Sequence, residues 1–286
     1  MKLGVLSGKG GTGKTSLAAA AARCLPNVTL VDCDVDAANL HLLFDVDVDS
    51  RGTFSGSQEA VRDETKCVSC GRCREVCRFH AVNEQFAIDP YMCEGCGACV
   101  TACLSDAITL RSRATGDWYT GHSAYGPLAG AELLPGEEAS GKLVTVVKQK
   151  GDELAEASGS THVVLDGAPG IGCPVIASLN DVEALILVTE PTVSGLHDLE
   201  RILGVARHFR IRSYLVLNKA DLSPPLAEGI ASFAAREGLL LLGEIPYDPL
   251  VPRLMVRGAS PVDDATSPAG VAMRGIFERL ATAEGL

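Results

Sequence analysis

The sequence lacks the features that would assign it to a membrane or to a nucleic acid. No run reaches the roughly 18 consecutive apolar residues that a membrane-spanning helix needs. The 286-residue chain has a formal net charge of −11, so it lacks the basic excess of a general nucleic-acid or membrane-surface binder. It begins with a short apolar run, and we expect no signal peptide. Eleven cysteines in such an acidic chain indicate a reducing, cytoplasmic compartment, where clustered cysteines more often bind metal than form disulfides.

A glycine-rich loop follows the apolar run Leu3–Leu6 and precedes an alanine-rich helical run over residues 16–24. A strand, a glycine-rich loop and a helix in this order predict a phosphate-binding loop. The glycines let backbone N–H groups approach phosphate oxygens, and the positive end of the helix faces the same anion. Lys14 is expected to contact the β- and γ-phosphates, and the Thr15 hydroxyl to bind Mg²⁺. The expected nucleotide-binding residues of this loop are Gly8, Lys9, Gly10, Gly11, Thr12, Gly13, Lys14, Thr15 and Ser16.

Aspartates close two further apolar runs. The run after the first helix ends in Asp32 and Asp34, and a later run ends in Asp166. Ligands of open α/β sheets bind beyond the carboxyl ends of the strands. Carboxylates there can hold Mg²⁺ or orient an attacking water, so we predict a magnesium site formed by Thr15, Asp32 and Asp166. The alternative is a solvated turn whose aspartates cap helices.

The glycine-rich loop resembles the deviant phosphate loop of the MinD/ParA/nitrogenase iron protein class of ATPases, because it carries a second lysine at position 9. The resemblance implies that Lys9 reaches across a dimer to the partner's nucleotide. It also implies that Asp34 activates the water, that Asp32 lies near the metal and that Asn39 belongs to the same site. Lys9, Lys14 and Asp34 are thus the expected catalytic residues. The expected assembly is a nucleotide-bound homodimer, or a heterodimer with a paralogous ATPase.

Eight cysteines form two copies of a C-x₂-C-x₂-C-x₃-C run, offset by 26 residues. The repeat indicates an internal duplication. Four thiolates within eleven residues favour a compact iron–sulfur cluster, whereas zinc sites usually use two separated C-x₂-C pairs. Zinc and disulfides are the alternatives. The two runs are Cys67, Cys70, Cys73 and Cys77, then Cys93, Cys96, Cys99 and Cys103.

The duplicated runs resemble the bacterial two-cluster ferredoxin. The resemblance implies two [4Fe–4S] clusters, in which the fourth cysteine of each run serves the other cluster. Arg78 and Leu104 stand where the family usually has proline, which leaves the ligands intact. The implied ligands are Cys67, Cys70, Cys73 and Cys103 for one cluster, and Cys93, Cys96, Cys99 and Cys77 for the other.

The base of the nucleotide is expected to lie near two later strand ends. Asn218 suits a purine edge, and Pro246 and Tyr247 match a loop that packs against the base in the MinD-like class. The N-K-x-D pattern that starts at Asn218 is also a guanine-reading motif of GTPases. Because Lys9 is typical of ATPases, we favour ATP over GTP.

Two remaining segments carry weaker signals. Cys173 lies at the spacing of a cluster ligand in the nitrogenase iron protein, but the sequence offers no second cysteine for such a site. A small buried residue, or a thiol that reports on the neighbouring loop, is the favoured interpretation. The C-terminal run has apolar residues at helical spacing with mixed charges, which favours a helix docked on the core over a membrane anchor.

The expected fold class is α/β, a doubly wound and mostly parallel sheet of the P-loop NTPase type with an inserted small α+β domain. The ATPase domain is assigned to residues 1–58 and 113–286, and the two-cluster ferredoxin-like domain to residues 59–112. Residues 45–65 are polar without a clear period and are expected to be a linker. Residues 113–142 are expected to form irregular or hairpin structure.

Three functions fit this combination. The first is an Mg-ATP-hydrolysing dimer whose closure is coupled to electron transfer through the two [4Fe–4S] clusters to a redox or iron–sulfur protein partner. The second is a MinD-like regulatory or positioning ATPase whose clusters are structural or sense redox state. The third is an iron–sulfur assembly or carrier protein. None of them involves a nucleic acid, and a membrane partner is not expected.

Overall fold

The computed structural model describes residues 1–138 and 141–286, which divide into two compact units. The first unit comprises residues 1–52, 118–132 and, of the described residues, 141–286. The second unit comprises residues 53–117 and 133–138. Each unit is described below by itself.

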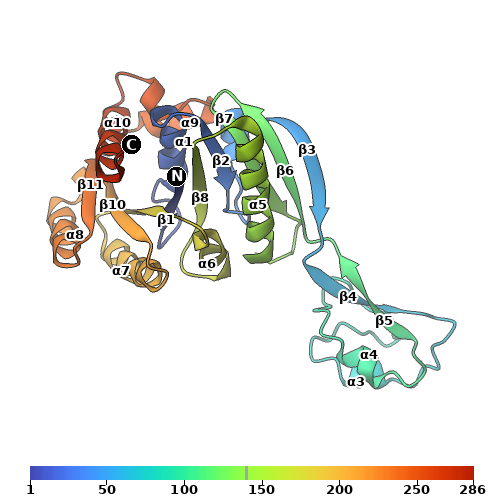
Figure 1. Cartoon of the computed structure of the whole chain (residues 1–286). Coiled ribbons are helices and arrows are strands. Elements are labelled where there is room, and N and C mark those ends of the chain that lie inside the picture. Colours follow the sequence, from blue (N-terminus) through green and yellow to red (C-terminus); the bar gives the residue numbers. More distant parts are fainter. Residues whose placement is uncertain (139–140) are drawn as a thin grey trace. The chain divides into compact units, whose positions relative to one another are not determined.

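The first unit is built on a nine-stranded sheet (Figure 1). From β11 through β10, β9, β1, β8 and β2 to β7, every neighbouring pair is parallel. Only two residues join β6 to β7, a length that can connect only antiparallel neighbours. In spatial order the strands are β11 (Leu240–Ile245), β10 (Arg212–Asn218), β9 (Ala184–Thr189), β1 (Lys2–Ser7), β8 (His162–Pro169), β2 (Val28–Asp32), β7 (Gly126–Leu133), β6 (Gly116–Ser123) and β3 (Asp47–Phe54).

Helices cover both faces of this sheet, which confirms the predicted α/β class with a large, mostly parallel sheet. Side chains alternate along a strand, so β1 directs Leu3 and Val5 to one face and Leu6 to the other. The helices are α1 (Lys14–Cys24), α2 (Leu40–Phe44), α5 (Gly141–Ser158), α6 (Cys173–Leu179), α7 (Val193–His208), α8 (Pro224–Arg236), α9 (Leu250–Val256) and α10 (Pro268–Glu284), with short 3₁₀ turns η1 (Ala220–Leu222) and η2 (Pro261–Asp263).

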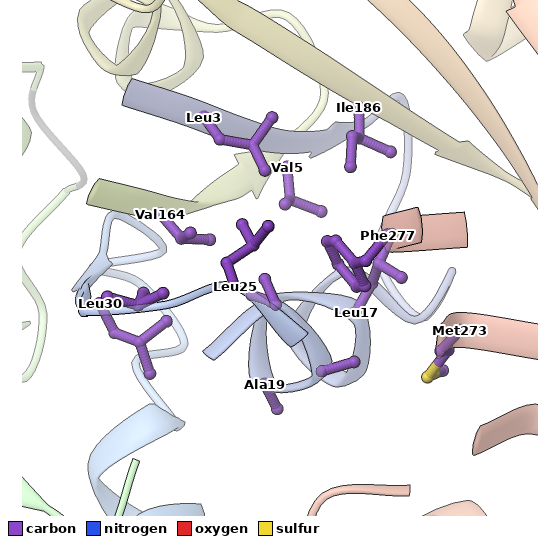
Figure 2. Close-up of a cluster of buried hydrophobic side chains, with 14 of the residues drawn as sticks. Leu3, Val5, Leu17, Ala19, Leu25, Leu30, Val164, Ile186, Met273 and Phe277 are labelled. Carbon is purple, nitrogen blue, oxygen red and sulfur yellow. The ribbon is translucent and has the colours of Figure 1, made fainter. Parts of the chain in front are cut away.

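One apolar core lies between the sheet, α1 and α10. Figure 2 shows Leu3 and Val5 of β1 pointing toward Leu17 of α1 and Phe277 of α10. Four of the five alanines of α1, Ala18 to Ala21, are fully buried, which brings this helix close to the strands. The expectation of a docked C-terminal helix is confirmed, because the apolar side of α10 belongs to this core. Among the described residues, no helix is both long and apolar enough to cross a membrane.

A second core lies on the opposite face, against α6, α7 and α8. Its members include Leu187 from β9, Leu199 from α7 and Ile230 from α8, each almost fully buried. The two cores fix the strands from both sides. The loops at the carboxyl ends of the strands are therefore held by a rigid frame.

The second unit is small and has little apolar core. Its antiparallel strands are β4 (Ser57–Arg62) and β5 (Ile108–Arg113), and its short helices are α3 (Arg72–Glu75) and α4 (Ala98–Ala102). The buried core consists of Ala60, Cys73, Val82 and Ile108, with cysteines packed against it. Each helix starts after a glycine with positive φ, Gly71 at 80° and Gly97 at 76°, so the duplication extends to the backbone.

The expectation of a linker over residues 45–65 is wrong, because β3 and β4 occupy most of this range. Every residue of β3 is exposed or half-buried, since β3 is an edge strand. It therefore lacks the apolar alternation that would reveal a strand in the sequence. The expected hairpin over residues 113–142 is observed as β6 and β7, which extend the main sheet.

Candidate functional site

The loop from Gly8 to Gly13 connects β1 to α1. Gly13 precedes the helix with φ of 93°, a conformation that L-residues rarely adopt. A Cβ at Gly13 would lie 2.3 Å from the Asn218 amide nitrogen, and one at Gly8 would lie 2.3 Å from the Asp198 Cβ. Both positions therefore require glycine. The loop is held tightly against the end of β10 and the second turn of α7.

A hollow of about 1270 Å³ opens at the carboxyl ends of the strands. The loop and the first residues of α1, Lys14 to Ser16, form one wall. Asp34, Asp36 and Asn39 form a second wall, and the third consists of the last two residues of β8, Ala168 and Pro169, with Pro174 of α6. Lys14 is only 6% exposed, although it is charged. A buried ammonium group needs a negative partner, and this hollow has the size and lining for one.

Asp166 lies within β8, close to Thr15 and Lys14 of this site, and is 1% exposed. Within the described part of the chain, neither carboxylate oxygen has a hydrogen-bond partner of good geometry. Burial raises the pKa of Asp166 to about 6, and the nearby Thr15 hydroxyl and Lys14 ammonium partly offset this increase. A buried carboxylate without partners, next to a threonine hydroxyl, has the donor chemistry of a Mg²⁺ site. The residues present therefore fit the ion that the sequence predicts.

Asp32 is fully buried and serves the neighbouring segment. Its Oδ1 accepts the Asp34 N–H at 3.2 Å, and its Oδ2 accepts the Asn39 and Leu40 N–H groups, each at 3.1 Å. Burial and the charge of Asp166 raise the pKa of Asp32, and the three N–H donors lower it. Asp32 therefore anchors the chain that carries Asp34 and Asn39 into the hollow. Its predicted contact with Mg²⁺ stays a prediction.

Asp34 lines the hollow directly and is half-buried. Burial raises its pKa, the Lys14 ammonium lowers it and the neighbouring Asp36 raises it. A carboxylate with this exposure can accept a hydrogen bond from a water that approaches a phosphate above Lys14. The structure thus brings Asp34, Lys14 and Thr15 to one site, as the strand–loop–helix argument expected.

A second hollow of about 660 Å³ shares Gly11, Gly13 and Ser16 with the first. The three residues expected to contact the base all line it: Asn218, Pro246 and Tyr247. Besides Ile245, Lys219 and Asp248, four apolar residues that the sequence did not assign to the site also line it: Val251, Pro252, Ala269 and Met273. They belong to α9 and α10, and in the sequence nothing distinguishes them from ordinary core residues.

The polar groups of the N-K-x-D segment are occupied by the protein itself. The Asn218 amide donates to the Thr12 carbonyl at 2.8 Å, and its oxygen accepts the Lys219 N–H at 2.9 Å. Asp221 accepts the Tyr247 N–H at 2.6 Å and does not line the second hollow. This segment therefore joins the phosphate-binding loop to the loop after β11.

Lys9 lies beside the end of β9 in its own chain. Its Nζ is 3.6 Å from Glu190 Oε2, and it is 3.4 Å from the hydroxyl oxygens of Thr192 and Ser194. The lysine does not line the phosphate hollow. Its contact with a partner's nucleotide stays a prediction of the resemblance.

In the second unit, the eight cysteines of the repeat are free thiols that surround two hollows. The Ala60 N–H donates to Cys93 Sγ at 3.4 Å and the Ala107 N–H to Cys103 Sγ at 3.3 Å, and hydrogen bonds from Ser105 and Ala107 lower the pKa of the Cys103 thiol. In residues 1–138 and 141–286, no three or more His, Cys, Asp or Glu side chains are grouped to hold a single metal ion. One hollow, of about 310 Å³, is lined by Cys67, Cys70, Cys73 and Cys103; the other, of about 350 Å³, by Cys77, Cys93, Cys96 and Cys99.

Cys173 lines neither of these hollows and is the first residue of α6. It is exposed in the single chain, so the expectation of a small buried residue is not met within one protomer. Cys33, next to the phosphate site, is fully buried, and burial raises the pKa of its thiol.

Comparisons with known proteins agree with the phosphate-site geometry. The family described as the CobQ/CobB/MinD/ParA nucleotide binding domain matches residues 3–262. The uncharacterized protein MJ0578 of Methanocaldococcus jannaschii is 32% identical over 283 residues, which cover 98% of this chain and 96% of that protein. The uncharacterized protein MJ0579 of the same organism is 29% identical over 233 residues, covering 78% and 81%.

Solved structures share the fold at low identity. The septum site-determining protein MinD of Pyrococcus horikoshii, complexed with Mg-ADP, is 20% identical with a TM-score of 0.59, covering 99% of this chain and 97% of that one. The MinC:MinD cell division protein complex of Aquifex aeolicus is 18% identical with a TM-score of 0.57, covering 99% of this chain and 96% of that one. A ParA family ATPase of Chlorobium tepidum is 18% identical with a TM-score of 0.55, and the match covers 98% of each chain.

Proposed function

Since the chain belongs to the CobQ/CobB/MinD/ParA nucleotide-binding family, we propose that it is a dimeric ATPase that binds and hydrolyses Mg-ATP. One observation carries this proposal: Lys14 and Asp34 line one hollow at the mouth of the phosphate-binding loop, and the buried carboxylate of Asp166 lies beside Lys14 and Thr15. The similarity to a MinD structure that contains Mg-ADP supports it.

Each residue of the site has a separate role in this proposal. Lys14 and the loop N–H groups bind the β- and γ-phosphates. Thr15 and Asp166 hold Mg²⁺, which when bound neutralises charge on the phosphates, and Asp32 keeps the Asp34 segment in place. Asp34 orients the attacking water. The Lys9 of each protomer stabilises the charge that develops in the other protomer's site.

The lining of the second hollow supports adenine as the base. Its wall includes the apolar side chains of Ile245, Pro246 and the α9 and α10 residues, and its charged members Lys219 and Asp248 are paired with Glu190 and Ser267. The groups that would read guanine, Asn218 and Asp221, are engaged with Thr12 and Tyr247. An apolar slot accepts the flat face of adenine without leaving a buried polar group unpaired.

An assay of nucleotide binding and phosphate release tests the ATPase proposal. Asp34→Asn should retain Mg-ATP binding and lose hydrolysis by about a hundredfold or more, since the water is no longer oriented. Asp36→Asn is the matched comparison, because Asp36 lines the same hollow and has no role in the proposal. Equal losses in both variants would overturn the assignment of Asp34.

The eight cysteines of the repeat support a second component of the proposal, two [4Fe–4S] clusters in a ferredoxin-like insert over residues 59–112. Each hollow gathers three cysteines of one run and the fourth of the other, the grouping that the ferredoxin resemblance implies. Anaerobic reconstitution with iron and sulfide should give about eight iron atoms per chain, four for each cluster. Stoichiometric zinc in place of iron would overturn this component.

The similarity to MinD, including MinD in a complex with MinC, supports a regulatory or positioning ATPase that binds a protein partner in a nucleotide-dependent way. In this version the clusters stabilise the insert or sense redox state. Variants that lose their clusters but retain ATPase activity and partner binding would support this regulatory or positioning function.

Coupling of hydrolysis to electron transfer is the second candidate. The observation in its favour is that one thiol of each hollow is exposed, Cys70 in the first and Cys96 in the second. Clusters held there would be open to a redox partner. Identical cluster potentials and electron-transfer rates with and without nucleotide would exclude this candidate.

A further inference from the structure

The amine of Lys9 is surrounded by acceptors from one short segment of its own chain. Glu190, Thr192 and Ser194 lie between the end of β9 and the start of α7, at the distances given above. The same Thr192 hydroxyl accepts the Gly195 N–H at 2.9 Å and so caps α7. The segment is therefore fixed by the helix that follows it, and Lys9 is held by a rigid neighbour.

Glu190 serves two lysines at once. Its Oε1 accepts from the Lys219 ammonium at 2.5 Å, while its Oε2 lies 3.6 Å from Lys9 Nζ. Lys219 also donates to the Gly11 carbonyl at 3.3 Å. The Glu190 side chain is 13% exposed, and each lysine is 32% exposed. One carboxylate thus faces two ammonium groups, and its longer, weaker contact is the one with Lys9.

We propose that Glu190 is a positioning residue that restrains Lys9 within the free protomer, and that closure of the nucleotide-bound dimer breaks this contact. The inference rests on the proposed function, in which Lys9 crosses to the partner's nucleotide. Lys9 cannot keep a contact 3.6 Å from its own Glu190 and also bind phosphate in the other protomer. The restraint therefore lowers the population of protomers ready to close.

The magnitude of this contact suits a reversible restraint. Ion pairs that are partly exposed to solvent are weak, and the charged phosphates of a partner's nucleotide offer Lys9 stronger, charge-assisted hydrogen bonds. Nucleotide in the partner can thus displace Glu190, whereas thermal motion alone leaves most free protomers restrained. Lys219 stays on Glu190 and keeps the carboxylate neutralised after Lys9 has left.

The first test measures the contact in the free protomer. Acetylation of lysines by an N-hydroxysuccinimide ester, followed by mass spectrometry without nucleotide, reports how free the Lys9 amine is. Glu190→Gln should raise the rate at Lys9 several-fold, relative to the exposed Lys66. Glu200→Gln removes an exposed carboxylate from α7 and is the matched control, expected to leave the rate unchanged. An unchanged rate in Glu190→Gln would overturn the restraint.

The second test measures its consequence for dimer formation. Each dimer releases two restraints, and each weak pair corresponds to about a threefold change, so Glu190→Gln should lower the dimer dissociation constant roughly tenfold. Sedimentation equilibrium with Mg²⁺ and a non-hydrolysable ATP analogue gives this constant. In Lys219→Gln, Lys9 is the one remaining ammonium group that contacts Glu190, so their ion pair should be stronger. This variant should show slower Lys9 acetylation and weaker dimerisation.

The outcomes separate the inference from the proposed function. If the wild-type chain dimerises on nucleotide and Glu190→Gln does so no more tightly, the role of Glu190 is wrong and the ATPase proposal stands. If neither the wild-type chain nor any variant dimerises, the proposal of a shared site is wrong, and the proposed effect of Glu190 on dimer formation is wrong as well. The acetylation result then still shows whether the contact within the protomer exists.

Discussion

The two units of this chain stabilise their sites in opposite ways. The first unit buries apolar side chains on both faces of a large sheet, and the nucleotide hollow lies at the edge of this frame. The second unit buries few apolar side chains, Ala60, Cys73, Ala81, Val82, Ala107 and Ile108, and places its cysteines around two hollows. The first unit can therefore hold its site ready before a ligand arrives. The second depends on what its thiols bind, because a core of this size contributes little stability.

The comparison predicts that changes in either unit act locally. A change in the first unit should alter nucleotide chemistry and leave the iron content unchanged, and a change at the cysteines should do the reverse. Each prediction below either sharpens this separation or would break it.

The largest effect is expected from Lys9→Ala. In the proposed dimer Lys9 acts on the partner's nucleotide, and a cation supplied across an interface accelerates phosphoryl transfer by about 10³-fold or more. Hydrolysis should fall by that order while Mg-ATP binding and the iron content stay as in the wild type. Lys142→Ala, which removes an exposed lysine of α5, is the matched control. Hydrolysis at the normal rate in Lys9→Ala would show that the site is not shared.

The sequence was sufficient to predict the α/β sheet and the charged residues that follow recognisable motifs. The strand–loop–helix order predicted the position of Lys14, and acids at strand ends predicted that Asp34 and Asp166 converge, because parallel strands present their carboxyl ends at one edge. The apolar spacing of residues 273–280 likewise predicted a docked α10.

The sequence could not reveal elements and contacts that leave no periodic or local pattern of residues. The edge strand β3 has no buried face, so its residues resemble a linker. The wall of the second hollow is apolar, and Met273 carries the same signal whether it packs in a core or lines a site. The pairing of Lys9 with Glu190 joins segments 181 residues apart, which no local pattern reveals.

The second-largest effect is expected from Phe277→Ala in the core of the first unit. Phe277 is 2% exposed, and removing a buried phenylalanine costs about 3–5 kcal/mol of the free energy of unfolding. Unfolding by denaturant, with nucleotide binding as the signal for the first unit, should show this loss. The absorption of the clusters, as the signal for the second unit, should disappear at the same denaturant concentration as in the wild type. If both signals shift together, the two units unfold as one and the comparison between them is wrong.

A smaller effect should follow from pH. The pKa of Asp166 is about 6, so below this pH the carboxyl becomes protonated and can no longer hold Mg²⁺. Calorimetry with Mg-ADP should show affinity falling about five- to sixfold between pH 6 and pH 5. The nucleotide-free chain should become more stable over the same range, because the ionised form of the buried carboxyl is the costly one. Asp166→Asn should bind Mg-ADP weakly at every pH, and persistence of the wild-type profile in this variant would contradict the assignment.

The last prediction concerns which cysteines ligate which cluster. It is tested by the iron content of variants that lack two cysteines. In the proposed assignment Cys103 belongs with Cys70, although it follows Cys96 in the sequence. The pair Cys70→Ala and Cys103→Ala should therefore remove one cluster and leave about four iron atoms per chain.

The pair Cys96→Ala and Cys103→Ala should remove ligands from both clusters and leave almost no iron, whereas Cys173→Ala should leave about eight. If each run instead ligated its own cluster, the two double variants would exchange their iron contents. Nucleotide binding should be unchanged in all three, because the first unit holds its site through its own cores. Loss of nucleotide binding with the iron would show that the thiol-bound groups support the ATPase fold as well, and would end the separation between the two units.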